Sequence, residues 1–235
     1  AGKLLIDMSG VEPIEKQGQV RWYEKPQRNH IYIVALDPSL GTGGDPAAIQ
    51  VYDATTMHQV AEWQHNLTII QQQVGILANI CRYIQDEIGD AGNIYYSVEN
   101  NTIGEAALIS IAEYGEENIQ GYFLSDPRTG GDRRYRKGFN TTNKPKLAAC
   151  NKLKTLIESG KMKIRSSALV SELKTFVASG VTYAAKIGET DDLVMACILA
   201  VRMLQTLQNF DAELDDRLRS NTDDDFLEPM PFIMI

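Results

Sequence analysis

The chain has 235 residues, of which 43% are hydrophobic and 23% charged, an ordinary composition for a soluble globular protein. This length suffices for one α/β domain with a sizeable core. No apolar run approaches the roughly 20 residues that a membrane span needs, so we expect no membrane segment. Cys81, Cys150 and Cys197 are scattered, with no CxxC pair or Cys/His cluster. We interpret them as reduced core residues, and a structural zinc site is not expected.

The net charge of −8 is distributed unevenly along the chain. Residues 209–235 contain eight acidic and two basic residues, a local charge of −6. Residues 128–146 have a local charge of +6, because Asp132 is their only acidic residue. Their basic residues are Arg128, Arg133, Arg134, Arg136, Lys137, Lys144 and Lys146. The molecule is therefore polarised, with one basic segment and one acidic tail.

The first half of the chain predicts three strands and a helix. Residues 1–30 show no clear periodicity and are interpreted as a linker or an arm on the domain. The apolar run 31–36 predicts a buried strand, and a glycine-rich turn at 41–44 follows it. Strands at 48–52 and 58–65 complete an antiparallel meander. A stripe of apolar residues then predicts a helix over 71–88.

The second half alternates strands with helices. Strands are predicted at 93–98, 121–124 and 162–165, with a hairpin around 181–185. Helices are predicted at 102–114 with Thr102 as N-cap, from Pro145 to before Gly160, at 169–177, and from a Thr190 cap onward. An antiparallel meander joined to parallel strands, with helices on both faces, is the arrangement of a ribonuclease H-like α/β fold.

Acidic residues stand at the ends of three of these elements. Asp37 ends the first strand, Glu99 follows the strand 93–98, and Asp191 and Asp192 open the last long helix. Such positions are exposed yet held by rigid elements, and Mg²⁺ or Mn²⁺ prefers carboxylate oxygens. Two such ions about 4 Å apart hydrolyse phosphodiesters in many enzymes. Asp37 is the natural bridging ligand, since a first-strand carboxylate in this fold lies at the centre of the sheet edge.

Each acidic residue also has an ordinary structural interpretation. An Asp before Pro often starts a turn, and Glu99 could be a surface residue. Asp191 and Asp192 could complement the helix dipole, and their side chains point about 100° apart, so one of them would face the site. Three acids together, at the three positions that one fold predicts, favour the catalytic interpretation.

Several segments resemble the nuclease motifs of the large terminase subunit, the DNA-packaging protein of T4-like tailed bacteriophages. These segments are LDPSLGTGGDPAA (36–48), YSVENN (96–101), ELKTFVASGVTYAAKIG (172–188) and GETDDLVMACILAVR (188–202). The similarity runs from about residue 3 to residue 207. It implies a catalytic and metal-binding triad of Asp37, Glu99 and one Asp of the 191–192 pair, of which we favour Asp192 as the direct ligand with Asp191 close by. Asp45 would be a supporting acid.

The resemblance implies a two-metal endonuclease that uses Mg²⁺ or Mn²⁺ to cut concatemeric viral DNA when genome packaging starts and ends. It implies double-stranded DNA, a portal protein and a small terminase subunit as partners, in the cytoplasm of an infected bacterium. The chain has no GxxxxGK[ST] phosphate loop, so the family's packaging ATPase domain is absent. We therefore expect a joint to that domain at 1–30, a nuclease domain at 31–208 and an acidic tail at 209–235.

The basic segment 128–146 is interpreted as a DNA-binding loop that contacts phosphates without reading sequence. A solvated loop is the alternative, and the acidic tail could be a solubilising tail, a docking segment or a shield for the basic loop. Other functions stay open at this point: a resolvase or recombinase of the same fold, an actin-like ATPase, or a DNA clamp or portal-docking module without activity.

Overall fold

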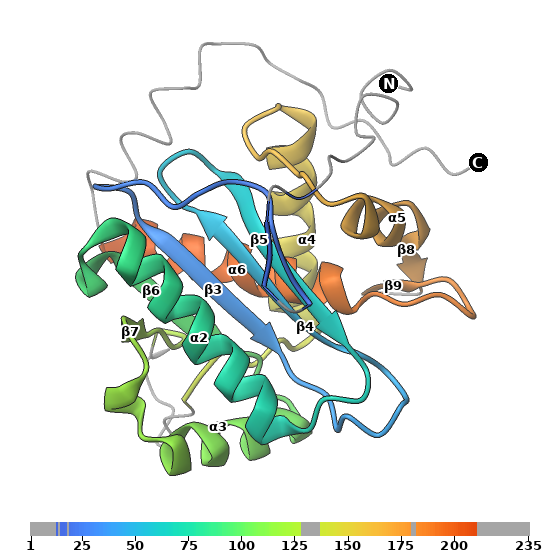
Figure 1. The fold of residues 1–235 in the computed structure, drawn as a ribbon. Helices are drawn as coiled ribbons and strands as arrows, with labels where there is room; N and C mark the ends of the chain where they lie inside the picture. The colour runs from blue at the N-terminus through green and yellow to red at the C-terminus, as the bar shows by residue number, and fades with distance from the viewer. Residues whose placement is uncertain (1–12, 14, 18, 128–136, 180–181, 211–235) are drawn as a thin grey trace.

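The computed structural model describes residues 13, 15–17, 19–127, 137–179 and 182–210. Its centre is a seven-stranded sheet in the order β1-β2-β5-β4-β3-β6-β7 (Figure 1). The strands are β1 (Glu15–Gln17), β2 (Val20–Trp22), β3 (Tyr32–Asp37), β4 (Ala47–Asp53), β5 (His58–His65), β6 (Ile94–Val98) and β7 (Tyr122–Phe123). The pairs β3–β4 and β4–β5 are antiparallel, whereas β6 runs parallel to β3 and β7 parallel to β6.

Helices cover both faces of this sheet, and Figure 1 shows α2 and α6 crossing on opposite sides. One face carries α2 (Ile70–Ile88) and α3 (Thr102–Tyr114), and the other carries α4 (Asn143–Glu158), α5 (Ser167–Thr175) and α6 (Asp192–Phe210). A hairpin of β8 (Phe176–Ser179) and β9 (Thr182–Ala185) joins α5 to α6. Short 3-10 turns lie at Ala91–Asn93 and Glu116–Asn118. The mixed sheet with helices on both faces confirms the predicted fold class.

The alternation of side chains along β3 explains why the sheet has two cores. Val34 and Leu36 belong to the core under α2, whereas Ile33 and Ala35 belong to the core under α6. Successive side chains of a strand point to opposite faces, so Asp37 follows Ala35 onto the α6 face. Every residue of β3 and β4 is buried, which accounts for their nearly continuous apolar sequences.

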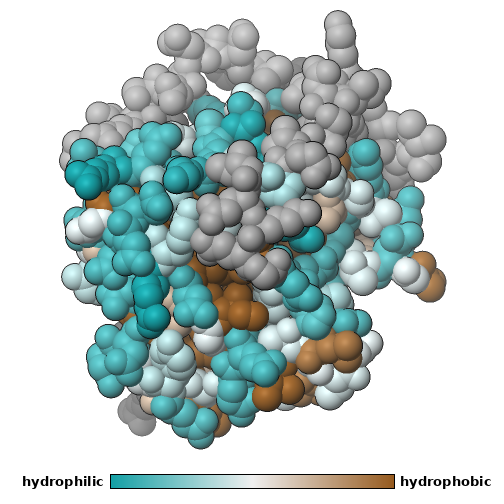
Figure 2. Space-filling view, in the orientation of Figure 1, coloured by the Kyte–Doolittle hydropathy of each residue, from teal (hydrophilic) through white to brown (hydrophobic). Residues whose placement is uncertain are grey.

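The surface in Figure 2 is largely hydrophilic, with several separate hydrophobic patches. The exposed large apolar side chains include Leu40, Leu67 and Ile69 in the loops beside the C-terminal end of β3, and Ile187 after β9. All three cysteines are buried and free, as the sequence predicts. In the described part of the chain, no helix is both long and apolar enough to cross a membrane.

Four local predictions need correction. The stretch 1–30, predicted as a linker or an arm on the domain, contains the β1–β2 hairpin, and β2 pairs with β5, so the folded domain starts before residue 31. The N-cap of α3 is Asn101, whose side chain accepts the N–H groups of Ile103 and Gly104, both at 2.9 Å. The segment 162–165 forms only an isolated bridge. The helix α6 begins at Asp192 and its first backbone hydrogen bond is accepted by the Asp191 carbonyl, so Asp191 and not Thr190 holds the N-cap position.

Candidate metal centre at the end of the central strands

Asp37 and Glu99 meet at one edge of the sheet because β3 and β6 are neighbouring parallel strands. The register pairs Leu36 with Val98, and the Glu99 N–H donates to the Leu36 carbonyl at 3.0 Å. Both carboxyl groups follow the alternation of their strands onto the α6 face, where Glu99 is close enough to raise the pKa of Asp37. Asp37 is 8% exposed and Glu99 6%, so this pair is largely shielded from water.

The N-terminus of α6 brings two further carboxylates to this pair. Burial raises the pKa of Asp37 well above its usual range, and Glu99, Asp192 and Asp191 raise it further. Burial also raises the pKa of Asp192 to about 7, with added repulsion from Glu172, Asp191 and Asp45. The side chains that most affect these two pKa values are all acidic, which marks a concentration of negative charge in a low-dielectric setting.

Asp191 and Asp192 differ in what their carboxylates contact. Asp191 accepts the backbone N–H of Ala185 at 3.2 Å, which ties β9 to the start of α6. Its backbone carbonyl also accepts the Met195 N–H at 2.7 Å, the first hydrogen bond of the helix. Asp192 is the first residue of α6 and is half-buried. Asp45 is exposed in the loop between β3 and β4, on the side of Asp192.

The loop after Asp37 is held by Gln73, a fully buried residue of α2. The Gln73 side-chain amide donates to the Ser39 carbonyl at 2.8 Å and the Thr68 carbonyl at 2.7 Å, and its oxygen accepts the Ser39 N–H at 3.3 Å. Gly41 lets this loop approach the backbone of Thr68, where a Cβ atom would lie 2.2 Å from the carbonyl oxygen. The end of β3 is thus fixed by backbone contacts, which favours a defined position for Asp37.

Glu99 is held from two directions. It forms a bridge with Phe139, and the next residue, Asn100, donates its N–H to the Phe139 carbonyl at 2.8 Å and its side-chain amide to the Lys137 carbonyl at 2.8 Å. On the other side, Gly104 of α3 approaches so closely that a Cβ atom there would lie 2.0 Å from the Glu99 carbonyl oxygen. Gly104 therefore allows α3 to pack closely against the backbone of a candidate ligand.

The donor atoms at this site are of the chemical type that a hard divalent cation prefers. Asp37, Glu99 and Asp192 offer carboxylate oxygens, which Mg²⁺ and Mn²⁺ prefer, and the acidic surroundings favour binding of positive charge. Among the described residues, no three His, Cys, Asp or Glu side chains lie in an arrangement that could hold one ion as they stand.

The predicted DNA-binding residues fall into two groups. Arg128, Arg133, Arg134 and Arg136 lie outside the described residues. Lys137 forms an ion pair with Glu116 and lies over the Phe123 ring, with its Nζ 4.5 Å from the ring centre. Lys144 is exposed and Lys146 half-buried in the first turn of α4. Lys146 lies over the Phe176 ring of β8, with its Nζ 5.7 Å from the ring centre.

Several residues around the site were not singled out from the sequence. Glu172 of α5 accepts hydrogen bonds at the N-terminus of α6, and Arg202 of α6 binds both carboxylate oxygens of Asp126 at 2.7 Å. Arg202 also lies over the ring of Phe139, the residue that bridges Glu99. The match at 172–188 marked the right segment, but a Glu or an Arg within a helix carries no local sign of such tertiary contacts.

The sheet order, the helices on both faces and the acidic strand ends define a domain of the ribonuclease H-like class. A sequence model of the Terminase RNaseH-like domain matches residues 34–204. This chain belongs to that family, as the sequence motifs predict.

Solved structures with the same fold come from phages and from a human virus. The large terminase nuclease from thermophilic phage G20c, solved with bound magnesium, is 20% identical; the match covers 84% of this chain and 94% of that one, with a TM-score of 0.62. The nuclease domain from Thermus phage P74-26 is 20% identical, over 83% and 91%, with a TM-score of 0.59. The human cytomegalovirus terminase nuclease domain, soaked with manganese, is 14% identical, over 89% and 97%, with a TM-score of 0.56.

Proposed function

We propose that this domain is a metal-dependent endonuclease that cuts double-stranded DNA during viral genome packaging. The observation that carries the proposal is the meeting of Asp37, Glu99 and Asp192, from β3, the end of β6 and α6, at one buried acidic edge of the sheet. Buried carboxylates without cationic partners cost stability, so a cluster of them indicates a function that uses the charge. Family membership supports a nuclease over a resolvase, a recombinase or an ATPase.

Asp37, Glu99 and Asp192 are the residues that we propose hold the metal. Both Glu99 and Asp192 raise the pKa of Asp37, so Asp37 is the carboxylate that we propose would be shared by two Mg²⁺ or Mn²⁺ ions. Glu99 would hold one ion and Asp192 the other, while Asp191 keeps β9 against α6 through its hydrogen bond to Ala185. Asp45 is proposed as a supporting acid on the outer side of Asp192. When bound, the ions supply an activated water and neutralise the charge that develops on the phosphodiester.

Binding of the DNA backbone is assigned to basic residues at the rim of this site. Lys144 and Lys146 stand in the first turn of α4, where the helix dipole adds a favourable field for phosphate. Lys137 is already paired with Glu116, so we assign it a weaker part in DNA contact. The four arginines from 128 to 136 remain candidates from the sequence. Contacts of this kind give salt-sensitive binding without sequence preference.

The proposed nuclease activity would serve viral genome packaging. We propose that the domain trims concatemeric DNA at the start and at the end of packaging, in the cytoplasm of an infected bacterium. Its partners there would be a packaging ATPase domain, a portal protein and a small terminase subunit. The segments 1–30 and 209–235 would connect to these partners, with residues 15–22 of the first segment belonging to the nuclease sheet.

The test is plasmid cleavage by the purified 235-residue chain with Mg²⁺, Mn²⁺ or EDTA. We expect cutting that requires metal and falls at least about 1000-fold in Asp37→Asn, since removing a bridging carboxylate removes a main source of charge stabilisation. Asp86→Asn is the matched control, because Asp86 is exposed near the C-terminal end of α2, which covers the opposite face of the sheet from α6. Metal-independent cutting, or full activity of Asp37→Asn, would contradict the proposal. DNA binding without cutting would favour the clamp or docking module.

A further inference from the structure

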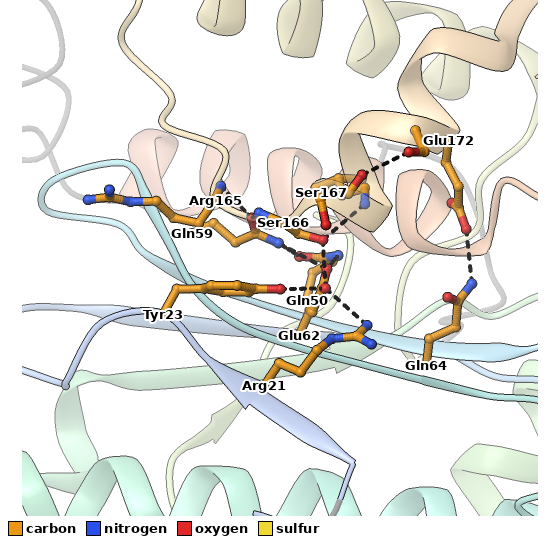
Figure 3. A network of polar contacts seen from close by, with 12 residues as sticks. Arg21, Tyr23, Gln50, Gln59, Glu62, Gln64, Arg165, Ser166, Ser167 and Glu172 are labelled. Atoms are coloured by element: carbon orange, nitrogen blue, oxygen red, sulfur yellow. Dashed lines mark hydrogen bonds and ion pairs between the residues drawn. The ribbon is translucent and has the colours of Figure 1, made fainter. Parts of the chain in front are cut away.

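Glu172 is a buried carboxylate that lies beside the proposed metal site without being one of its predicted ligands. It belongs to α5 and is 8% exposed. Its Oε1 accepts the Gln64 side-chain amide at 2.9 Å and the Thr190 hydroxyl at 3.1 Å, and its Oε2 accepts the Val194 N–H at 3.1 Å. In Figure 3, Glu172 and Gln64 point toward each other from α5 and β5.

The contact with Val194 caps α6 from another helix. The first N–H groups of a helix have no partner within the helix, and Val194 is the third residue of α6. A carboxylate usually fills this role from the N-cap position itself, but the Asp191 side chain accepts from Ala185 of β9 instead. Glu172 thus supplies the charge and the acceptor that the first turn of α6 needs, at the turn that presents Asp192.

The same carboxylate is close enough to Asp192 to repel it. Among the acidic neighbours of Asp192, Glu172 raises its pKa most. Burial also raises the pKa of Glu172, which its donors, among them Gln64, Val194 and Thr190, partly offset. If Glu172 served only to cap α6, its carboxylate could lie away from Asp192 and avoid this repulsion. Three directional hydrogen bonds toward α6 and β5 indicate that the position of α6 is what Glu172 secures.

The α5 helix is anchored at both ends to neighbouring positions of β5. At its N-terminus, Ser166 caps the helix by accepting the Leu169 N–H at 3.0 Å and donates to Glu62 at 2.6 Å. At its C-terminal half, Glu172 accepts from Gln64. Glu62 and Gln64 are two residues apart on β5 and therefore face the same side (Figure 3). The central sheet, α5 and the start of α6 are thereby linked through polar contacts.

We propose that Glu172 is a positioning residue that fixes the first turn of α6, and with it Asp192, for metal binding. This inference rests on the proposed metal site. It assigns Glu172 no contact with the metal or the DNA, and its effect passes through the hydrogen bonds to Thr190 and Val194. Residues that orient ligands in this way typically change metal affinity about 10-fold to 100-fold when altered.

The test measures Mn²⁺ binding by isothermal titration calorimetry on the full chain and its Glu172→Gln variant. Gln has the same shape but only one oxygen, so an amide group would face the Val194 N–H or the Gln64 and Thr190 donors. We expect Mn²⁺ affinity to fall about 10-fold or more and the Val194 amide to exchange faster with solvent. Glu172→Asp, which keeps the charge on a shorter side chain, should retain more affinity than Glu172→Gln.

Glu62→Gln is the matched control, since Glu62 is a buried carboxylate of the same polar network that makes none of the contacts to α6. It should lower the melting temperature while leaving Mn²⁺ affinity within about 2-fold, because its hydrogen bonds reach α5 and the sheet only. A folded Glu172→Gln variant with the Mn²⁺ affinity of the unaltered protein would overturn the inference. If Glu172→Gln does not fold, Thr190→Val removes one donor from an exposed residue, and unchanged affinity there would overturn it too.

Failure of the proposed function has a different signature. Mn²⁺ binding that depends on Glu172 but is accompanied by no DNA cleavage under any metal would remove the nuclease proposal and leave the positioning role intact. Absence of Mn²⁺ binding in the unaltered chain would overturn both. Cleavage with normal metal dependence in a folded Glu172→Gln variant would leave the nuclease intact and remove the positioning role.

Discussion

Two buried carboxylate clusters lie on the same side of the sheet, and they differ in the charge of the side chains that surround them. Glu62, in the middle of β5, is fully buried and accepts the Tyr23 hydroxyl at 2.7 Å, with Arg21 at 3.0 Å as a cationic partner. Asp37, at the end of β3, is 8% exposed, and the side chains that most affect its pKa are acidic. The first cluster is satisfied by the protein alone, whereas the second concentrates negative charge that forms no ion pair among the described residues.

The difference separates a structural polar network from a candidate active site. Burial of a carboxylate costs several kcal/mol unless hydrogen bonds and an opposite charge offset that cost. Around Glu62, donors from β2, β4, β5 and the start of α5 provide the offset. At Asp37 the offset would come from a cation. Both clusters are buried, so burial alone does not distinguish them; the sign of the neighbouring charges does.

Glu62→Gln should give the largest loss of stability. Breaking a buried ion pair leaves Arg21 without its carboxylate and weakens the bonds from Tyr23 and Ser166, so we expect the free energy of unfolding to fall by about 3 kcal/mol. Urea unfolding followed by circular dichroism measures this change. Cleavage at a temperature where the variant stays folded should remain near the original rate. A loss of cleavage without a loss of stability would place Glu62 in the catalytic cluster instead.

Addition of Mn²⁺ should stabilise the domain, because a cation compensates the charge around Asp37. At a free concentration 100 times the dissociation constant, binding adds about 2.7 kcal/mol to the free energy of unfolding. Thermal unfolding with Mn²⁺ or EDTA measures this, and Asp37→Asn should lose most of the shift. An equal shift in Asp37→Asn would show that the metal binds somewhere else.

Gly104→Ala should destabilise the chain by roughly 1–3 kcal/mol, as overpacking of a close contact usually does. The new Cβ atom would lie 2.0 Å from the Glu99 carbonyl, so the strand end must move and cleavage should fall at least about 10-fold. Gly75→Ala in α2 is the matched control, since no atom lies within 4 Å of the Cβ there. That substitution should stabilise by about 0.5–1 kcal/mol through helix propensity.

Asp37→Asn should have a smaller effect on stability, of the opposite sign. A carboxyl whose pKa is raised by folding costs stability once the pH exceeds its unfolded-state pKa, and this cost grows until the pH passes the folded-state pKa. In EDTA at pH 8 we expect the variant to be about 1–2 kcal/mol more stable, and at pH 4 nearly equal to the unaltered protein. Urea titrations at the two pH values test this, and a destabilised variant at pH 8 would contradict it.

The central elements could be predicted because their sequences carry strong periodic signals. The predicted strand 58–65 coincides with β5, and the predicted helix 71–88 begins one residue after the start of α2. The three-residue strands β1 and β2 carry no such signal, since pairing with β5 and packing of Trp22 define them. The N-cap of α3 was misplaced by one residue because Asn101 and Thr102 are both good capping residues and only the backbone distinguishes them.

The meeting of the candidate carboxylates could be predicted where they end neighbouring strands, and not where contacts between distant elements bring residues together. Asp37 and Glu99 end neighbouring strands, so their meeting follows from strand order alone. Glu172 lies within a helix, and its importance comes from the distant partners Gln64 and Val194. The hydrogen bond of Asp191 to Ala185, which distinguishes it from Asp192, depends on how the β8–β9 hairpin folds back.

The residues on either side of the stretch 128–136 are fixed to each other and to α6. Asp126 donates its N–H to the Gly138 carbonyl at 3.1 Å, Gly138 donates to the Ser125 hydroxyl at 3.1 Å, and Arg202 holds Asp126. These contacts therefore hold residues 125–126 and residue 138 together, next to Glu99. Changes within 128–136 should therefore leave this end of β6 in place, because the contacts that fix it are made by residues outside that stretch.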